Sequence, residues 1–432
     1  QPQPPPPTPP PTPVPPQKCL SKFIFYAPFF FSTFFLFFSL LLATKYGHSL
    51  AMVLMLVATL LAIPLKRNSK IPKEIKFASG FLLFLGFFWS HTFDDLFSLS
   101  LKGDYLVRYI LGAWLMVVLS KVPINPHAVL YGLSAGGIAA GILAAMQYEE
   151  MGRAEGFTNA IRFGDLAILM GIISLSAAML KIFSTKERTF FAIASFFGLL
   201  ASILSLSRGG WPALIAIPVI FFFIFRESKK IALFFTLSLL PIFLIFINLP
   251  PVESRIQEAT KQINGYFDEH EQYVQTSLGA RLEMWKTALL MGKEKPFTGW
   301  GDKNIQNKRL EYVEKSISHP VIMEFNHAHN DFLEMWARRG IIGIIALIGI
   351  YVIPILLIIS FYRKNKYTVK NNERLTSINK FLVISGVLIY FGYFIFGLSD
   401  VFFTFVIGHN FYLFSLIFIL SSMQWIQKEN SK

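Results

Sequence analysis

The side chains best suited to chemistry form five short polar groups along a mostly apolar chain. Arginine and histidine stand out in these groups. A guanidinium group stays protonated and matches phosphate or carboxylate oxygens through a planar fork, and an imidazole can take up a proton near neutral pH. Together, such side chains can bind an anion and move a proton. The five groups are residues 153–159, 205–211, 277–285, 326–331 and 397–400.

His327 and His329 form an H-x-H pair that could bind a metal ion together with Asp331 and Glu334. Such a pair directs both imidazoles to one side only in an extended segment, whereas the residues that follow are typical of a helix. We therefore expect no metal, with His329 as a general base and His327 as a structural or substrate-binding neighbour. Asn330 and Asp331 could hydrogen-bond a sugar or orient the imidazole. The alternative for Asn330 is to cap the helix.

Arg208 and Arg281 are the main candidates for binding the anion. Arg208 follows an apolar stretch on the side of the membrane where arginines are disfavoured, and the next two residues are glycines, which allow a ligand to approach the backbone closely. The alternative is that Arg208 anchors a helix end. For Arg281, on an expected interfacial helix, the alternative is a contact with a lipid headgroup. Arg153 and Arg162 flank a short loop and could add contacts to a phosphate.

Four other polar residues lie near the ends of apolar stretches. Arg108 lies inside one, where an arginine suggests a functional contact with a diphosphate, and pairing with Asp165 is an equally good interpretation. Asn159 belongs to the same short loop as two of the arginines and is a further substrate-binding candidate. Asp400 is costly to place near a membrane, so we expect it to orient an arginine or a histidine. The alternative for Asp400 is a helix cap.

Twelve apolar stretches must position these groups, and most approach the length of about 20 residues that a helix needs to cross a bilayer. The shorter stretches must borrow flanking residues or tilt. The sequence therefore predicts an all-α integral membrane protein with about twelve transmembrane helices. The stretches are residues 20–43, 49–65, 77–91, 105–120, 127–147, 163–184, 189–206, 211–225, 231–248, 340–362, 381–398 and 402–425.

The distribution of lysine and arginine predicts the orientation of the spans. If the N-terminus is cytoplasmic, the loops and tails on that side carry 22 lysines and arginines, and the opposite short loops carry five. This bias places both termini in the cytoplasm. The net charge of +14 would suggest nucleic acid in a soluble protein, but here most of the excess lies in loops that face anionic lipid. We expect membrane lipids as partners and no nucleic acid.

Five regions follow from this pattern. Residues 1–19 are a proline-rich, disordered extension, residues 20–248 hold spans one to nine, and residues 340–425 hold spans ten to twelve before a cytoplasmic tail at 426–432. Residues 249–339 form one large loop on the non-cytoplasmic, periplasmic face. We expect this loop to contain helices at 254–267, 277–291 and 305–318, lying on the membrane with their apolar faces down.

One formal motif is rejected. Gly132, Ser134 and Gly136 match the G-x-S-x-G pattern of serine hydrolases, but they fall within an apolar helical span, with no preceding strand to form the required turn. Together with Gly137 and Gly141, the glycines are more typical of close helix packing.

Four of the segments resemble the O-antigen ligase family, within the larger group of bacterial membrane enzymes that share the O-antigen polymerase and ligase domain. The resemblance covers roughly residues 20 to 425. The segments are SLSRGGW at 205–211, SLGARLEMW at 277–285, NHAHNDFLEMWARRGIIG at 326–343 and GLSD at 397–400.

The resemblance implies a metal-independent, inverting glycosyltransferase of the bacterial inner membrane. Its donor would be a glycan on undecaprenyl diphosphate, and its acceptor would be the lipid A–core. The essential arginines and histidine of the family would correspond to Arg208, Arg281 and His329. Fixed guanidinium groups can neutralise the charge that grows on the leaving diphosphate, and an imidazole can take the proton of the attacking hydroxyl. No cofactor is expected.

Two kinds of rival remain open at this point. An O-antigen polymerase or a protein O-oligosaccharyltransferase would share the donor site and differ in the acceptor. A flippase or another transporter of polyprenyl-linked glycans belongs to a different class. Transporters tend to place charges at the middle of the bilayer and often have repeated halves. Here the polar groups gather at one face and the halves show no repeat, which disfavours transport.

Overall fold

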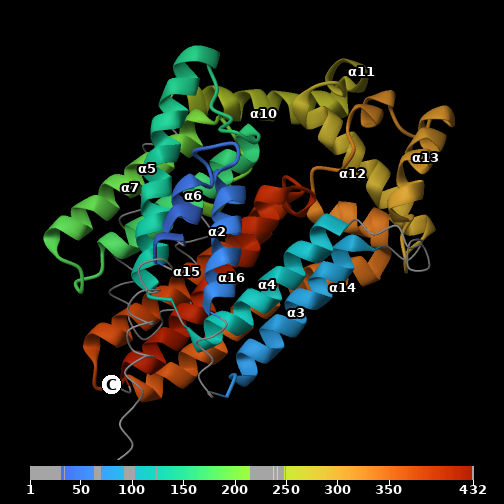
Figure 1. Ribbon diagram of the computed structural model, residues 1–432. Coiled ribbons are helices and arrows are strands. Elements are labelled where there is room, and N and C mark those ends of the chain that lie inside the picture. The colour runs from blue at the N-terminus through green and yellow to red at the C-terminus, as the bar shows by residue number, and fades with distance from the viewer. Residues whose placement is uncertain are drawn as a thin grey trace, which may run out of the picture.

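A computed structural model describes residues 31–33, 35–62, 70–91, 103–122, 124–214 and 250–430, together with the single positions 237, 241 and 248. Within these ranges every regular element is a helix, which confirms the all-α prediction (Figure 1). Six of the described helices are long and apolar enough to cross a membrane. They are α5 (Pro126–Met151), α6 (Ala160–Ala178), α7 (Thr185–Leu204), α14 (Asp331–Thr368), α15 (Glu373–Gly397) and α16 (Val406–Asn430).

The predicted number of twelve spans is not established by these helices. The expected spans two, three and four correspond to α2 (Gly47–Ala62), α3 (Lys73–Ser90) and α4 (Gly103–Lys121). Spans eight and nine and the proline-rich extension lie almost wholly outside the described residues. The last span is shifted: a 3-10 turn, η5 (Phe402–Thr404), precedes α16, and α16 continues to Asn430 through most of the expected tail.

Helix α16 lies in the middle of the bundle and packs against α4, α5, α14 and α15 (Figure 1). Most of its side chains are buried, and some of the polar ones are hydrogen-bonded; Gln424 Nε2, for example, donates to the carbonyl of Ser120 at 2.7 Å. On the outer helices the pattern is reversed, because large apolar side chains such as Phe84 on α3 and Ile345 on α14 are exposed. Such an arrangement suits lipid rather than water as the surrounding medium.

Helix α5 shows why the G-x-S-x-G pattern is structural. A Cβ at Gly132 would lie 2.8 Å from the carbonyl oxygen of Phe35, and one at Gly141 would lie 2.6 Å from that of Phe197. The glycines therefore let neighbouring backbones approach α5 closely. Ser134 is buried and hydrogen-bonds Ser174 at 2.9 Å, which confirms the packing interpretation.

Helices α10 (Pro250–Asp268), α11 (His270–Tyr273), α12 (Ser277–Glu294) and α13 (Gly301–Glu314), with the 3-10 turn η4 (Pro320–Glu324), lie together at one end of the bundle (Figure 1). The three expected helices of this segment are present, although α13 begins and ends about four residues early. Leu289 of α12 is 45% exposed, and the buried stripe of this helix is Ala280, Met284, Ala288 and Met291. These smaller and more flexible residues allow α12 to pack closely on its neighbours.

A kink in α14 attaches this segment to the bundle. Gly340 has φ 59° and ψ −151°, a conformation open only to glycine. The kink exposes backbone groups to the turn between α12 and α13, where Ile341 N donates to Pro296 O at 2.7 Å and Trp300 N donates to Ala337 O at 2.9 Å. The helix starting at Asp331 therefore continues into span ten but does not run straight. It bends where the turn docks.

Candidate functional site

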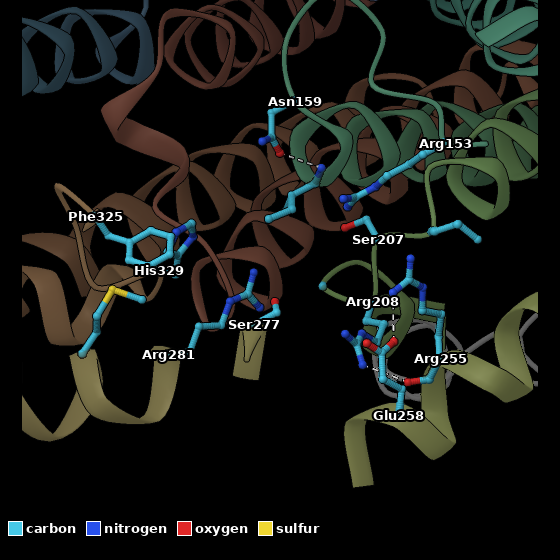
Figure 2. A pocket seen from close by; sticks show the side chains of 14 residues that line it. Arg153, Asn159, Ser207, Arg208, Arg255, Glu258, Ser277, Arg281, Phe325 and His329 are labelled. Atoms are coloured by element: carbon cyan, nitrogen blue, oxygen red, sulfur yellow. Dashed lines mark hydrogen bonds and ion pairs between the residues drawn. The ribbon is translucent and has the colours of Figure 1, made fainter. Parts of the chain in front are cut away.

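A cavity of about 410 Å³ lies between the bundle and the helices at its end. Five separate segments line it: the α5–α6 loop, the turn after α7, α10, α12 and the loop before α14. Figure 2 shows its polar side chains converging from these segments. The lining polar residues are Arg153, Asn159, Ser207, Arg208, Arg255, Glu258, Ser277, Arg281 and His329.

Five residues selected from the sequence meet in this cavity: Arg153, Asn159, Arg208, Arg281 and His329. They come from positions up to 176 residues apart in the chain, so only the fold brings them together. Asn159 has a structural task as well, because its side chain accepts a hydrogen bond from Ile161 N at 2.9 Å and caps α6.

The guanidinium groups of the cavity keep most of their N–H groups available. Arg153 Nε donates to Ser205 O at 2.9 Å, and one terminal nitrogen of Arg208 donates to Arg255 O at 2.8 Å. No side chain or carbonyl of the described residues accepts a hydrogen bond from Arg281. Burial lowers the pKa of all three groups, but a guanidinium remains charged at neutral pH. The cavity is therefore a pre-formed site for an anion with several oxygens.

Sequence reasoning missed Arg255 and Glu258 on α10. Arg255 donates to Glu258 at 2.9 Å, and Glu258 is the only carboxylate among the residues that line the cavity. Four arginines against one carboxylate leave a net positive charge. The pair has the i, i+3 spacing common on exposed helix faces, so nothing in the sequence distinguishes it from a surface ion pair. The sequence also offered no reason to single out Ser207 within the polar group 205–211. Its buried hydroxyl has no hydrogen-bond partner in the described structure.

His329 is held by a buried carboxylate. Its Nδ1 lies 3.0 Å from Asp400 Oδ1, and Arg162 Nε lies 3.4 Å from Asp400 Oδ2. Burial by itself would raise the pKa of Asp400, but the hydrogen bond from His329 and the charge of Arg162 together hold it below the ordinary value. An ionised Asp400 accepts the proton of Nδ1, so Nε2 of His329 carries the free lone pair. The prediction that Asp400 orients an arginine or a histidine agrees with both contacts.

A network of hydrogen bonds fixes the loop that carries His329. The backbone of Ala328 donates to Glu334 at 2.7 Å and accepts from Trp285 Nε1 at 2.9 Å. Arg309 and Arg338 both pair with Glu334. His329 itself has φ 50°, in the left-handed region that costs a residue other than glycine on the order of 1 kcal/mol or more. The network holds this conformation and, with it, the direction of the imidazole.

The expectation that His327 and His329 would not direct both imidazoles to one side is wrong. The helix begins only at Asp331, and the imidazoles of His327 and His329 lie side by side with ring centroids 4.2 Å apart. With Asp400 they bring three potential ligand atoms within 4.8 Å of one another. A metal ion there would have to replace the contact of His329 with Asp400 and lie close to Arg162.

Burial and the neighbouring His329 lower the pKa of His327 to about 4.

Other selected residues lie outside the cavity. Arg108 donates to Asn410 Oδ1 at 2.5 Å, and the alternative of pairing with Asp165 is wrong, because the carboxylate of Asp165 lies against Gly210 at the turn after α7, without a hydrogen-bond partner among the described residues. Asn330 caps α14, as the alternative interpretation held, and donates to Leu398 O at 3.0 Å. Asp331 is buried and accepts from Tyr351 at 2.9 Å. The contacts of Asn330 and Asp331 hold the start of α14, next to His329.

The glycines after Arg208 also permit close packing, and Gly209 lines the cavity as well. A Cβ at Gly209 would lie 2.5 Å from Ser399 Oγ, and one at Gly210 would lie 2.5 Å from Asp165 Oδ1. The close approach that they permit is therefore to α6 and to the segment before Asp400. Because Gly209 packs against Ser399, this contact places the segment of Arg208 beside the segment of Asp400.

Two comparisons place the chain among known proteins. A family model described as O-antigen ligase matches residues 193–348, a range that includes Arg208, Arg281 and His329. A protein of Haemophilus influenzae, described only as an uncharacterized protein, is 30% identical over 336 residues, which are 74% of this chain and 82% of that protein. The description of this relative names no activity.

Proposed function

Because the chain belongs to the O-antigen ligase family, we propose that this multi-pass membrane protein is a glycosyltransferase that moves a glycan from undecaprenyl diphosphate to a hydroxyl group of the lipid A–core. The observation that carries the proposal is the cavity itself, in which four arginines face one imidazole held by a buried aspartate. Anion binding and proton removal are the two tasks that this transfer requires.

The arginines would bind the diphosphate of the donor. As the bond between the anomeric carbon and the diphosphate oxygen breaks, negative charge grows on that oxygen. Arg281, without a hydrogen bond to the described residues, and the free N–H groups of Arg153 and Arg208 are placed to neutralise it. Cations fixed in position before the reaction usually make the largest catalytic contribution, because they need no reorganisation as charge develops.

His329 would activate the acceptor. A hydroxyl oxygen of the acceptor attacks the anomeric carbon from the side opposite the diphosphate, and its proton passes to Nε2 of His329. The glycosidic bond forms as the bond to the diphosphate breaks, so the configuration at the anomeric carbon inverts. The imidazolium ion that results is stabilised by Asp400 at 3.0 Å. The proton then returns to solvent or to the released diphosphate.

We place the protein in the bacterial inner membrane, with both termini in the cytoplasm and the cavity on the periplasmic face. The bias of 22 against five basic residues supports this orientation. Reporter fusions test it: a fusion at Asn371 should report the cytoplasm, and a fusion at Asn307 should report the periplasm. A cytoplasmic signal at Asn307 would contradict the placement of the cavity.

The lipopolysaccharide of a deletion strain separates the ligase from its closest rival. A strain without the ligase should lose all capped lipopolysaccharide on a gel and accumulate carrier-linked polymer, and the wild-type gene should restore it. A strain that instead keeps core with a single repeat would identify the protein as a polymerase. An unchanged gel profile would contradict both assignments and favour a protein acceptor.

A further inference from the structure

A second cavity, of about 250 Å³, shares one wall with the arginine-lined cavity. Residues 157–162 contribute to both: Asn159 and Ile161 line the first, and Phe157, Thr158 and Arg162 line the second. Its other walls come from the turn after residue 40 and from the start of α16. We refer to it as the Arg162 cavity. Nothing in the transfer reaction proposed above uses it.

Arg162 is buried there with too few partners for its charge. The residue is 8% exposed. Its Nε faces Asp400, which His329 also uses, and the flat face of its guanidinium lies over the ring of Phe405. Its two terminal nitrogens make no hydrogen bond with any described residue. Only Nε is among the fully buried atoms without a hydrogen-bond partner, so the terminal nitrogens keep accessible surface and are available to an anion that enters the cavity.

The remaining walls combine a second cation with apolar side chains. Lys45 lies exposed at the rim, and buried Leu41, Leu42 and Ile407 line the interior. Lys45 and Arg162 are two of the five basic residues on the weakly basic side of the membrane, so the orientation rule does not explain them. A cationic end and an apolar wall match a molecule with a phosphate at one end and hydrocarbon chains at the other.

We propose that the Arg162 cavity binds the phosphate group of an anionic membrane lipid, with the lipid chains along Leu41, Leu42 and Ile407. The phosphate would accept hydrogen bonds from the terminal nitrogens of Arg162 and pair with Lys45. Through Arg162 the bound lipid would steady Asp400. The binding itself does not depend on glycan transfer, so it can be tested even if the proposed function fails.

The test uses the purified full chain in neutral detergent, with phosphatidylglycerol as the probe and native mass spectrometry to measure retained lipid. Wild type should retain phosphatidylglycerol in preference to phosphatidylcholine, whose headgroup has no net charge. Arg162→Gln should weaken phosphatidylglycerol binding by about tenfold or more, the usual scale for losing charge-assisted hydrogen bonds. The matched control Arg153→Gln, in the other cavity, should bind the lipid as wild type does.

A second variant keeps the test decisive if Arg162→Gln does not fold. Val406 is 37% exposed and lines the same cavity. Val406→Trp should therefore fill the space while leaving Arg162 in place, and it should abolish the preference for phosphatidylglycerol over phosphatidylcholine. Wild-type binding in both variants would overturn the proposal. Loss of binding in Arg153→Gln would overturn it as well, because the lipid would then occupy the arginine-lined cavity. Displacement by equimolar inorganic phosphate would also overturn the proposal, because the lipid chains would then add nothing to binding.

Discussion

Replacing Asp400 by asparagine should slow glycan transfer strongly without removing donor binding. Asp400 does not line the arginine-lined cavity; it acts through His329, whose Nδ1 it contacts at 3.0 Å. Asparagine removes the negative charge. Its amide can also rotate and donate to Nδ1, which would fix the imidazole in the tautomer that has no free lone pair at Nε2. The variant therefore impairs His329 as a general base and leaves the arginines in place.

The size of the effect follows from the distance. Opposite unit charges 3 Å apart attract by roughly 5.5 kcal/mol at an effective dielectric constant of about 20, which corresponds to about four orders of magnitude in rate. General base catalysis contributes only about 10²–10⁴-fold in total, so the loss cannot much exceed that range. We expect the turnover rate to fall by about 10²–10⁴-fold while KM for the donor changes little.

The assay is transfer by purified protein in proteoliposomes, with donor concentration varied to separate turnover from KM. Asp268→Asn, an exposed carboxylate at the end of α10, is the matched control and should behave as wild type. Thermal unfolding in detergent checks that the variant folds. Turnover within a few fold of wild type in folded Asp400→Asn would refute the role assigned to the His329–Asp400 pair.

Three further predictions concern the arginines, a metal and His327. Arg281→Lys keeps the charge but loses the planar fork. It should raise KM for the donor and lower turnover, so that kcat/KM falls by about tenfold or more while expression stays normal. Wild-type kinetics would reduce Arg281 to a membrane contact. Full transfer activity should persist in EDTA, and activity lost there but restored by one divalent ion would assign His327, His329 and Asp400 as ligands. The folded protein keeps His327 neutral down to about pH 4, whereas the unfolded chain binds a proton below about pH 6.5. The free energy of unfolding should therefore fall as pH drops from about 6.5 to 4, by at most about 3 kcal/mol from this group, and unfolding midpoints of His327→Gln should show a smaller acid shift than wild type.

The sequence predicted which polar groups would meet, because loops on one side of a membrane must share a face. Arg208, Arg281 and His329 line one cavity for that reason, and Arg153 and Asn159 join them from the short loop before α6. That these loops share a face followed from the order of the apolar stretches, whereas the choice of Arg208, Arg281 and His329 within them also drew on the resemblance to the O-antigen ligase family.

The sequence could not predict contacts that depend on how helices are rotated or where they start. Arg255 lines the cavity because α10 turns that face inward, and its local pattern is the same as that of a surface ion pair. The imidazoles of His327 and His329 lie edge to face because α14 begins only at Asp331 and because the backbone of His329 is left-handed. The start of α14 is set by the Asn330 cap, whereas the loop with the left-handed His329 is held by the contacts of Ala328 with Glu334 and with Trp285 of α12.

The central claim is that the arginines bind the donor while His329 performs proton removal, and one measurement separates the two tasks. The affinity of purified His329→Ala for an undecaprenyl-diphosphate-linked glycan is compared with its rate of transfer to lipid A–core. The account predicts wild-type affinity and a rate lower by about 10²-fold or more. A variant that lost donor affinity but kept its rate at saturating donor would contradict the account, because His329 would then be a phosphate ligand rather than the base.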